Sequence, residues 1–183
     1  MSIQSVINSH PIVTNAALGM LVAGIGDSLC QFIEMKDSKQ TFTLSTWDYR
    51  RSSNLGLIRG FLIVPFVVIW YKKLAKMYPD TTNVSLLKRC LTNELIGSPF
   101  CIALVFIGNA FLTSANPMQD FIQRMKIQGI ATWANSISFW PLCHLLVTFR
   151  LPPTYQPIWA SFAAVFWNAI LSFHTNIVIT EEL

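Results

Sequence analysis

The stretch LIGSPFCIALVFIGNAFLTSA occupies residues 95–115 and contains no charged side chain. A helix needs about 20 predominantly apolar residues in succession to cross the hydrocarbon core of a bilayer. Residues 95–115 meet this length, so they predict a membrane-spanning helix, which Asn116-Pro117 ends. A membrane helix in the middle of a short chain predicts an integral membrane fold for the whole.

Further apolar stretches of similar length lie on both sides of this one. They cover about residues 12–32, 52–71, 129–149 and 157–177. The first contains Asp27 and the second contains Arg59, so their insertion is the least certain. Together the stretches predict an all-α integral membrane helix bundle of four to five transmembrane helices, forming a single multi-pass domain over residues 1–183.

The composition agrees with this fold class. The chain has 183 residues, of which 52% are hydrophobic and only 12% are charged. A typical soluble domain has about 25% charged residues. The net charge of +4 comes from scattered Lys and Arg rather than from a dense basic stripe with interleaved aromatic residues. We therefore expect the lipid bilayer as a partner and no direct contact with nucleic acid.

Prolines interrupt the second, third and fourth of these stretches, at Pro65, Pro99 and Pro141. Each removes a backbone donor and predicts a kinked segment, either as fixed shape or as a hinge for gating. The segment 118–128 places Asp120 and Arg124 on a helical spacing among apolar residues, which is typical of an amphipathic turn or two at the membrane interface.

Four ionisable residues lie inside or beside apolar stretches and form a candidate polar path: Asp27, Arg59, Glu94 and His144. Two interpretations stay open. In one, Asp27 or Glu94 pairs with Arg59 and holds the bundle in register. In the other, the groups line a polar path through the bundle and tune its selectivity.

Glycines in the first two stretches are candidates for helix packing. Gly56 and Gly60 form a GxxxG motif, and Gly19 begins a small-xxx-small pair. Gly26 lies two helical turns after Gly19, on the same face of the helix. Glycine at this spacing lets two helix backbones approach closely and gain dispersion contact. The motif identifies a packing surface and no particular function.

No catalytic, cofactor-binding or metal-binding residues are predicted. The chain has no Gly-rich phosphate loop, no GxSxG, no HExxH and no close pair of carboxylates. The cysteines and histidines are scattered and form no recognisable metal constellation; they are Cys30, Cys90, Cys101, Cys143, His10, His144 and His174. We therefore expect that the protein is not an enzyme.

Several short motifs match a family pattern spread over nearly the whole chain. In order they are His10-Pro11, Gly26-Asp27 with Gln31, residues 48–51, residues 60–65, Trp70-Tyr71, residues 79–82, Lys88, Pro99, Trp140-Pro141, Pro152 and residues 167–172. Together they resemble the family of the mitochondrial inner-membrane protein Mpv17 and the 22-kDa peroxisomal membrane protein. The most specific part runs from Trp140 to Ser172 and includes Pro141, Pro152, Trp167 and Asn168.

The resemblance implies a small organelle membrane protein with four transmembrane helices, acting as a non-selective channel or pore. It implies the mitochondrial inner membrane, with the peroxisomal membrane as the alternative. It also implies a link to membrane potential, reactive oxygen species and mitochondrial DNA maintenance. Because the N-terminal segment lacks an Arg-rich amphipathic start, we expect any organelle address to be internal.

The chain departs from this family pattern at polar positions. The usual Asp-Gln is Asn93-Glu94 here, which moves the carboxylate by about 100° around a helix. The usual Gln of the fourth helix is His144. If the family's polar residues line a pore, the lining of this one differs.

Two functional hypotheses follow. The first is solute permeation, in which small hydrophilic solutes or ions pass among kinked helices. The second is a non-conducting structural scaffold, which the GxxxG face and the interfacial aromatic residues would serve equally well. The sequence leaves open the solute, the gating stimulus, the orientation and association with further copies of the chain as a homo-oligomer.

Overall fold

The computed structural model describes residues 10–167, and within that range it is built from helices without strands. The first helix, α2, runs from Pro11 to Asp37 and contains the predicted stretch 12–32. Pro11 occupies the first turn, where the missing N–H of a proline costs no hydrogen bond. The predicted all-α class is confirmed for the described residues.

The second long helix returns beside α2 and has three parts. They are α3 (Tyr49–Ile58), a π-helical turn η1 (Arg59–Ile63) and α4 (Val64–Met77). Asp48 caps its start, because the Asp48 carboxylate accepts a 2.9 Å hydrogen bond from the backbone N–H of Arg51. The helix extends beyond both ends of the predicted stretch 52–71.

The third long helix has the same construction. It consists of α5 (Asn83–Thr92), the π-helical turn η2 (Asn93–Gly97) and α6 (Ser98–Thr113). The predicted stretch 95–115 therefore covers only its apolar second half. The first half was missed because polar residues such as Lys88 and Arg89 interrupt its apolar ones, although Thr82 caps its start by accepting from the N–H of Ser85 at 3.3 Å.

Both π-helical turns lie directly before a proline. A proline ring meets the carbonyl four residues earlier and offers no donor to it. For Pro65 that carbonyl belongs to Phe61 in η1, and for Pro99 it belongs to Leu95 in η2. A wider turn makes room for the ring, so each helix continues past its proline through a locally expanded segment.

The second half of the described chain folds over the long helices. It comprises α7 (Pro117–Arg124), a π-helical turn η3 (Met125–Gly129), α8 (Ile130–Leu146) and a 3₁₀ turn η4 (Thr148–Arg150). Residues 156–167 are helical as well. The predicted stretch 129–149 corresponds to α8 and η4. Of the predicted stretch 157–177, residues 168–177 lie outside the described range.

Three helices of the described part are long and apolar enough to cross a membrane: Pro11–Lys36, Tyr49–Met77 and Asn83–Thr113. Large apolar side chains on them face outward, as expected of surfaces in lipid; Leu21, Phe61 and Leu95 are each more than 60% exposed. Helix α8 does not reach this threshold, because polar residues such as Asn135 and His144 interrupt it. A fourth or fifth span stays a prediction.

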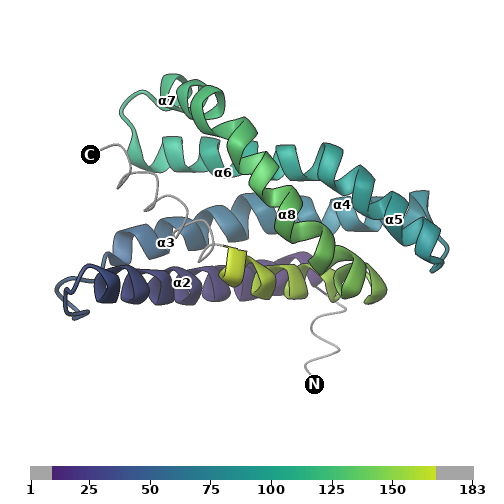
Figure 1. Cartoon of the computed structure of the whole chain (residues 1–183), viewed down its shortest axis with the longest axis horizontal. Coiled ribbons are helices and arrows are strands. Elements are labelled where there is room, and N and C mark those ends of the chain that lie inside the picture. The colour runs from purple at the N-terminus through teal and green to yellow at the C-terminus, as the bar shows by residue number, and fades with distance from the viewer. Residues whose placement is uncertain (1–9, 168–183) are drawn as a thin grey trace.

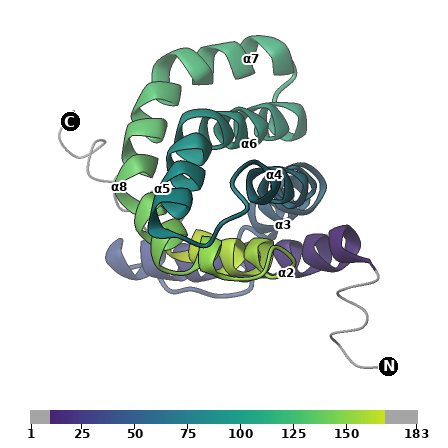
Figure 2. The same cartoon turned by 90° about the vertical axis from the view of Figure 1, so that its right-hand side faces the viewer.

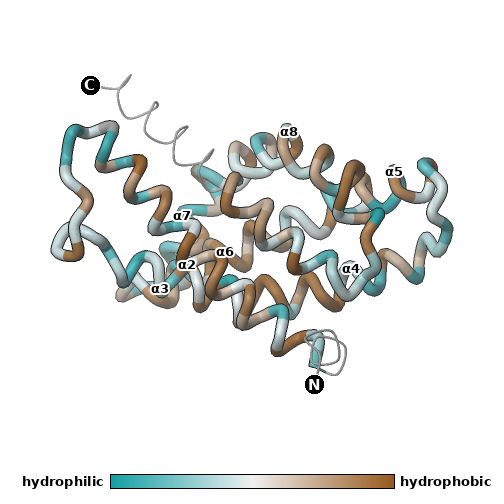
Figure 3. The backbone as a smooth tube through the Cα atoms, turned by 90° about the horizontal axis from the view of Figure 1, so that it is seen from below, coloured by the Kyte–Doolittle hydropathy of each residue, from teal (hydrophilic) through white to brown (hydrophobic). Residues whose placement is uncertain are grey.

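The helices stack in layers. Viewed end-on, the α3–α4 helix lies between α2 and α6, with α7 beyond α6 (Figure 2). Helix α8 crosses obliquely from α7 back toward α2, and the chain turns lie at the two long ends of the bundle (Figure 1). Hydrophilic residues gather at those turns, whereas much of α6 is hydrophobic (Figure 3).

The hydrophobic core lies between α4, α5 and the C-terminal end of α8. Its buried members are Ile58, Ile63, Val67, Tyr71, Leu74, Leu86, Cys90, Phe149 and Ala160. This core closes one end of the bundle. The remaining interior, between α3, α6 and α8, holds polar groups and a cavity.

Candidate functional site

A cavity of about 580 Å³, partly open to the surface, lies among α2, the α3–α4 helix, α6 and α8. Its size falls within the range of small-molecule sites, roughly 300–1,000 Å³. Polar side chains from distant parts of the sequence line it; they are Asp27, Glu34, Arg51, Arg59, Tyr71, Asn93, Ser98, Gln128, Thr132, Ser136 and His144. A space with so many hydrogen-bonding groups is suited to water and hydrophilic solutes.

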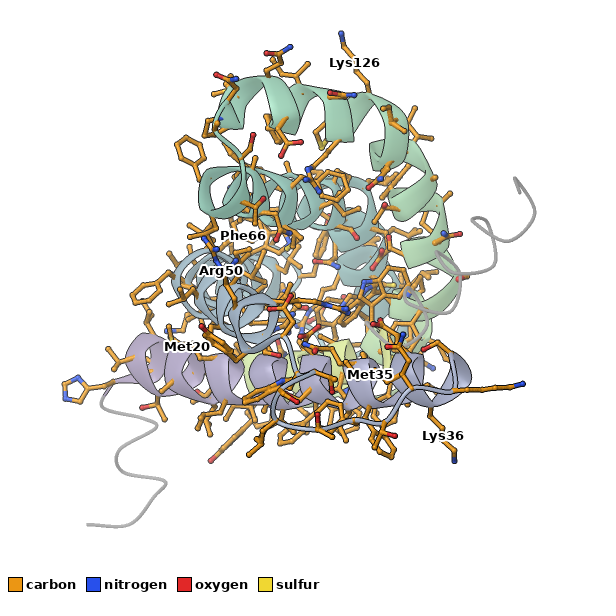
Figure 4. The ribbon with its side chains drawn as sticks, turned by 90° about the vertical axis from the view of Figure 1, so that its left-hand side faces the viewer. Met20, Met35, Lys36, Arg50, Phe66 and Lys126 are labelled. Atoms are coloured by element: carbon orange, nitrogen blue, oxygen red, sulfur yellow. The ribbon has the colours of Figure 1, made fainter. Side chains whose placement is uncertain are left out.

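The glycines bring α2 against the α3–α4 helix beside this cavity. A Cβ atom placed on Gly56 would lie 3.2 Å from the backbone oxygen of Met20, and one on Gly60 would collide with the Met20 side chain. Figure 4 shows Met20 at this junction. Likewise, a Cβ on Gly19 would lie 2.7 Å from Val64 Cγ2. A Cβ on Gly26 would lie 3.0 Å from a methyl group of Val165, so this glycine lets α2 approach residues 156–167 in the same way.

At one end of the cavity a buried carboxylate is fully engaged. Asp27 is only 2% exposed, and its Oδ1 atom lies 2.9 Å from Arg51 Nε. Its Oδ2 atom accepts hydrogen bonds from Gln31 Nε2 and Ser52 Oγ, each at 2.7 Å. A buried charge is tolerated when it is paired and hydrogen-bonded in this way. Asp27 therefore holds α2 to the start of α3.

Arg51 joins this carboxylate to a second one nearer the surface. Its two terminal nitrogens donate to Glu34 at 2.8 and 3.1 Å, which is the bidentate geometry that a guanidinium favours. The Arg51 side chain is 41% exposed and that of Glu34 27%. Figure 4 views the molecule from this end, where the nearby Lys36 points away from the bundle.

Arg59 lies in the wall of the cavity, and within residues 10–167 its hydrogen-bond partners are all neutral. One terminal nitrogen donates to the carbonyl of Ala160 at 2.8 Å and approaches Ser161 Oγ at 3.4 Å. Its Nε atom is buried without a hydrogen-bond partner. Because Arg59 begins the π-helical turn η1, the expanded backbone next to Pro65 sets where its side chain leaves the helix.

At the other end, Glu94 and His144 form a buried pair. Glu94 Oε1 lies 2.9 Å from His144 Nδ1, and the two residues are 5% and 2% exposed. Tyr71 holds the far ring nitrogen of His144, with its hydroxyl 3.1 Å from Nε2. Asn93 donates to Glu94 Oε1 at 3.1 Å and accepts from Trp70 Nε1 at 3.0 Å. The pair therefore ties η2 to α8.

The structure places three of the four candidate residues in the wall of one cavity. Asp27, Arg59 and His144 line the cavity, whereas Glu94 lies behind His144 and outside the lining. The interpretation that Asp27 or Glu94 pairs with Arg59 is wrong, because Asp27 pairs with Arg51 and Glu94 with His144.

Sequence reasoning missed some of the site. Arg51 looked like an ordinary basic residue at a helix start, and its spacing from Glu34 gave no signal. The two departures from the family pattern, at Glu94 and His144, did signal the site, because these two residues contact each other in the structure.

One cluster with metal-ligating groups also escaped the sequence analysis. Cys90 Sγ, a Glu94 oxygen and a His144 ring nitrogen all lie within 4.8 Å of one another, and all three residues are buried. Cys90 and Glu94 are four residues apart on one helix, but His144 comes from α8, 50 residues further along. One of the scattered cysteines and one of the scattered histidines therefore do lie in a compact group, together with a glutamate.

The family-motif residues of the second half pack around the cavity. The Trp140 ring stacks on His144 at 5.5 Å and meets the Trp167 ring at 6.3 Å, as expected for tryptophans that pack between helices. Both tryptophans line the cavity. Pro141 lies inside α8, and Pro152 lies in the turn that follows η4. Asn168 and Ser172 lie outside the described residues.

Comparison with known proteins gives one family match and several relatives of nearly full length. The model of the Mpv17 / PMP22 family matches residues 110–172. PXMP2/4 family protein 2 of Dictyostelium discoideum is 25% identical over 168 residues, covering 91% of this chain and 85% of that protein. Mitochondrial inner membrane protein Mpv17 of Caenorhabditis elegans is 23% identical over 168 residues, covering 92% and 88%. Peroxisomal membrane protein 2 of Bos taurus is 22% identical over 163 residues, covering 89% and 82%. No solved structure matches the chain.

Proposed function

Because the chain belongs to the Mpv17 / PMP22 family, we propose that it is a non-selective channel-type protein that lets small hydrophilic solutes or ions cross an organelle membrane. The membrane proposed first is the mitochondrial inner membrane, where relatives named Mpv17 are placed by their names. The peroxisomal membrane is the alternative. In the mitochondrial case, permeation would modulate membrane potential, reactive oxygen species and mitochondrial DNA maintenance.

The single observation that carries this proposal is the placement of Arg59 in the cavity wall, where its partners among the described residues are all neutral. Arg59 lies inside the helix Tyr49–Met77, which is long and apolar enough to span a membrane. A charge at the bilayer centre costs at least about 2.5–3.5 kcal/mol, so it normally faces protein or water. Since its hydrogen bonds leave Nε without a partner, water or a solute in the cavity is the natural complement.

The charges along the cavity suggest how solutes would be selected. Two carboxylates and Arg51 stand at one end, Arg59 lies in the wall, and the Glu94–His144 pair closes the other end. The carboxylates favour cations at the first end, and Arg59 opposes them further in. Such an arrangement discriminates weakly by charge, as expected of a path with little selectivity. The work of the protein is then to supply a wetted path, without covalent chemistry.

The scaffold alternative loses part of its support in this fold. The GxxxG face was the surface that a scaffold would offer to other membrane helices. Gly56 and Gly60 instead face Met20 of the same chain, so this face is already occupied. The observation favours permeation over scaffolding without excluding partners elsewhere on the apolar surface.

Single-channel recording of the purified protein in planar bilayers tests the proposal. We expect discrete conductance steps from the unaltered protein and a higher cation-to-anion permeability ratio from Arg59→Met, which keeps the length of the side chain and removes its charge. A unit charge about 8 Å from a permeating ion contributes about 0.5 kcal/mol in water and about 2 kcal/mol at an effective dielectric constant of 20. Because this charge acts with opposite sign on a cation and on an anion, the energy counts twice in the ratio, which should change by about 5- to 1,000-fold.

Lys72→Met is the matched control, because Lys72 is an exposed cation on the same helix and does not line the cavity. It should change the permeability ratio by less than Arg59→Met does. The absence of discrete conductance from folded protein would favour the scaffold. An unchanged ratio in Arg59→Met, with conductance retained, would show that the cavity is not the path.

A further inference from the structure

We propose that Cys90, Glu94 and His144 form a binding site for Zn²⁺ at the end of the cavity. The three residues are called the zinc cluster below. The proposal concerns metal binding itself and stands or falls independently of solute permeation.

The backbone already brings the three ligand atoms together. Cys90 and Glu94 are separated by one helical turn, so both side chains lie on the same face of the α5–η2 segment. That face meets His144 of α8, and the Cys90, Glu94 and His144 ligand atoms lie within 4.8 Å of one another. Zinc bonds of about 2.0–2.3 Å in tetrahedral geometry place ligand atoms roughly 3.3–3.6 Å apart. Side-chain movements of about 1 Å would bring the ligand atoms to these separations.

A second observation points to a missing cation. Glu94 is 5% exposed, and its buried Oε2 atom has no hydrogen-bond partner in the part of the chain that the structure describes. A buried acceptor of this kind calls for an explanation such as an ion, since most buried polar atoms are satisfied. Glu94 Oε1 is engaged by Asn93 and His144, so Oε2 is the oxygen left over for a metal.

The surroundings of the zinc cluster resemble the outer shell of a metal site. The Tyr71 hydroxyl contacts Nε2 of His144, so Nδ1, which lies 2.9 Å from Glu94 Oε1, is the nitrogen that would bind the metal in place of this hydrogen bond. Metal-bound histidines almost always use their second nitrogen in such a hydrogen bond. Trp70 orients Asn93, which in turn donates to the Glu94 carboxylate. Trp133 Nε1 donates to the backbone carbonyl of Glu94 at 2.8 Å and fixes the backbone there.

Zinc fits these ligands better than magnesium or calcium does. A thiolate with an imidazole selects zinc or copper, whereas oxygen ligands select the harder ions. The Cys90 thiol lies 4.0 Å from the Pro141 carbonyl, a long contact that a metal could replace. Loss of the thiol proton gives a thiolate and a carboxylate that together neutralise Zn²⁺, which suits a site away from bulk water. A water from the cavity can complete the four ligands, since His144 lines the cavity wall.

Cobalt substitution tests the zinc cluster directly. The purified full-length protein in detergent is freed of metal with a chelator and titrated with Co²⁺, then with Zn²⁺. We expect about one Co²⁺ per chain, a thiolate-to-cobalt charge-transfer absorption, and its loss when Zn²⁺ displaces the cobalt. Cys90→Ser should remove the absorption and weaken Zn²⁺ binding by about 100-fold. Cys143→Ser, on α8 next to His144 but outside the zinc cluster, should leave both within about twofold.

Alkylation of the unaltered protein keeps the test valid if Cys90→Ser does not fold. Zn²⁺ should protect Cys90 from a thiol reagent, as mapped by mass spectrometry, more than it protects Cys143. Equal labelling of Cys90 with and without Zn²⁺ would overturn the proposal. So would a cobalt spectrum without thiolate absorption, or one that persists in folded Cys90→Ser.

Discussion

The buried Glu94–His144 pair should behave as one energetic unit. His144→Leu leaves the Glu94 carboxylate in a site that is 5% exposed, with Asn93 as the only remaining donor among its present partners. Removing the partner of a buried carboxylate costs about 3–5 kcal/mol, because the carboxylate then stays buried and uncompensated. For a chain of about 150–250 residues, 1 kcal/mol lowers the melting temperature by about 2–4 °C. The expected loss is therefore about 6–20 °C.

The double substitution Glu94→Leu with His144→Leu should recover most of this loss. Replacing both members of a buried pair with apolar side chains is often nearly neutral. We therefore expect the double variant to lie within about 2 kcal/mol of the unaltered protein, so that the two single losses are far from additive. Thermal unfolding of the purified protein in detergent, without added metal, followed by intrinsic fluorescence, measures all four variants of the cycle.

A matched control is available on α7. Arg124 Nε lies 2.9 Å from Asp120 in an ion pair whose side chains are 40% and 24% exposed. Because water screens this pair, Asp120→Ala should change the stability by less than about 1 kcal/mol. If the losses of stability in the Glu94–His144 cycle are additive, or if His144→Leu costs no more than Asp120→Ala, then the two residues do not stabilise the fold as a coupled buried pair.

Two further predictions concern the other end of the cavity and the helix packing. Asp27→Asn removes a carboxylate from the cavity and leaves Arg51 with Glu34 alone, so the cation-to-anion permeability ratio in planar bilayers should fall, and an unchanged ratio would remove Asp27 from the path. Gly97→Ala should lower stability by about 1–3 kcal/mol, because the added carbon would collide with the Trp70 ring. Gly24→Ala is its control in thermal unfolding, since no atom lies closer than 4.0 Å to the new carbon, and it should be neutral or stabilising by up to about 1 kcal/mol.

Much of the fold could be predicted because the signal is local. An uncharged stretch such as residues 95–115 needs no partner to be recognised as a membrane helix. The start of the same helix at Asn83 could not be recognised in this way, since polar residues such as Lys88 and Arg89 interrupt its apolar ones. The continuity of α5 with α6 depends on the expanded turn before Pro99, and hydropathy does not report on backbone geometry.

The site was harder to predict because its contacts join distant residues. Asp27 was recognised as an isolated charge in an apolar stretch, but its partner Arg51 belongs to the next helix. Spacing within one helix can suggest a pair four residues apart, as for Cys90 and Glu94. It says nothing about His144, which reaches them only through the crossing of α8 over α5.

The glycines that pack the helices also determine where the buried Arg59 side chain lies. Gly56 and Gly60 let α2 approach the α3–α4 helix, and Arg59 lies between them in sequence, on another face of that helix. A Cβ on Gly19 would lie 3.5 Å from Arg59 Cγ, so this glycine also leaves space for the arginine stem. The close packing that lipid cannot replace therefore fixes where a positive charge enters the interior. From the sequence, helix packing and the polar path were separate hypotheses. In the structure, the packing glycines position Arg59, which belongs to the candidate polar path.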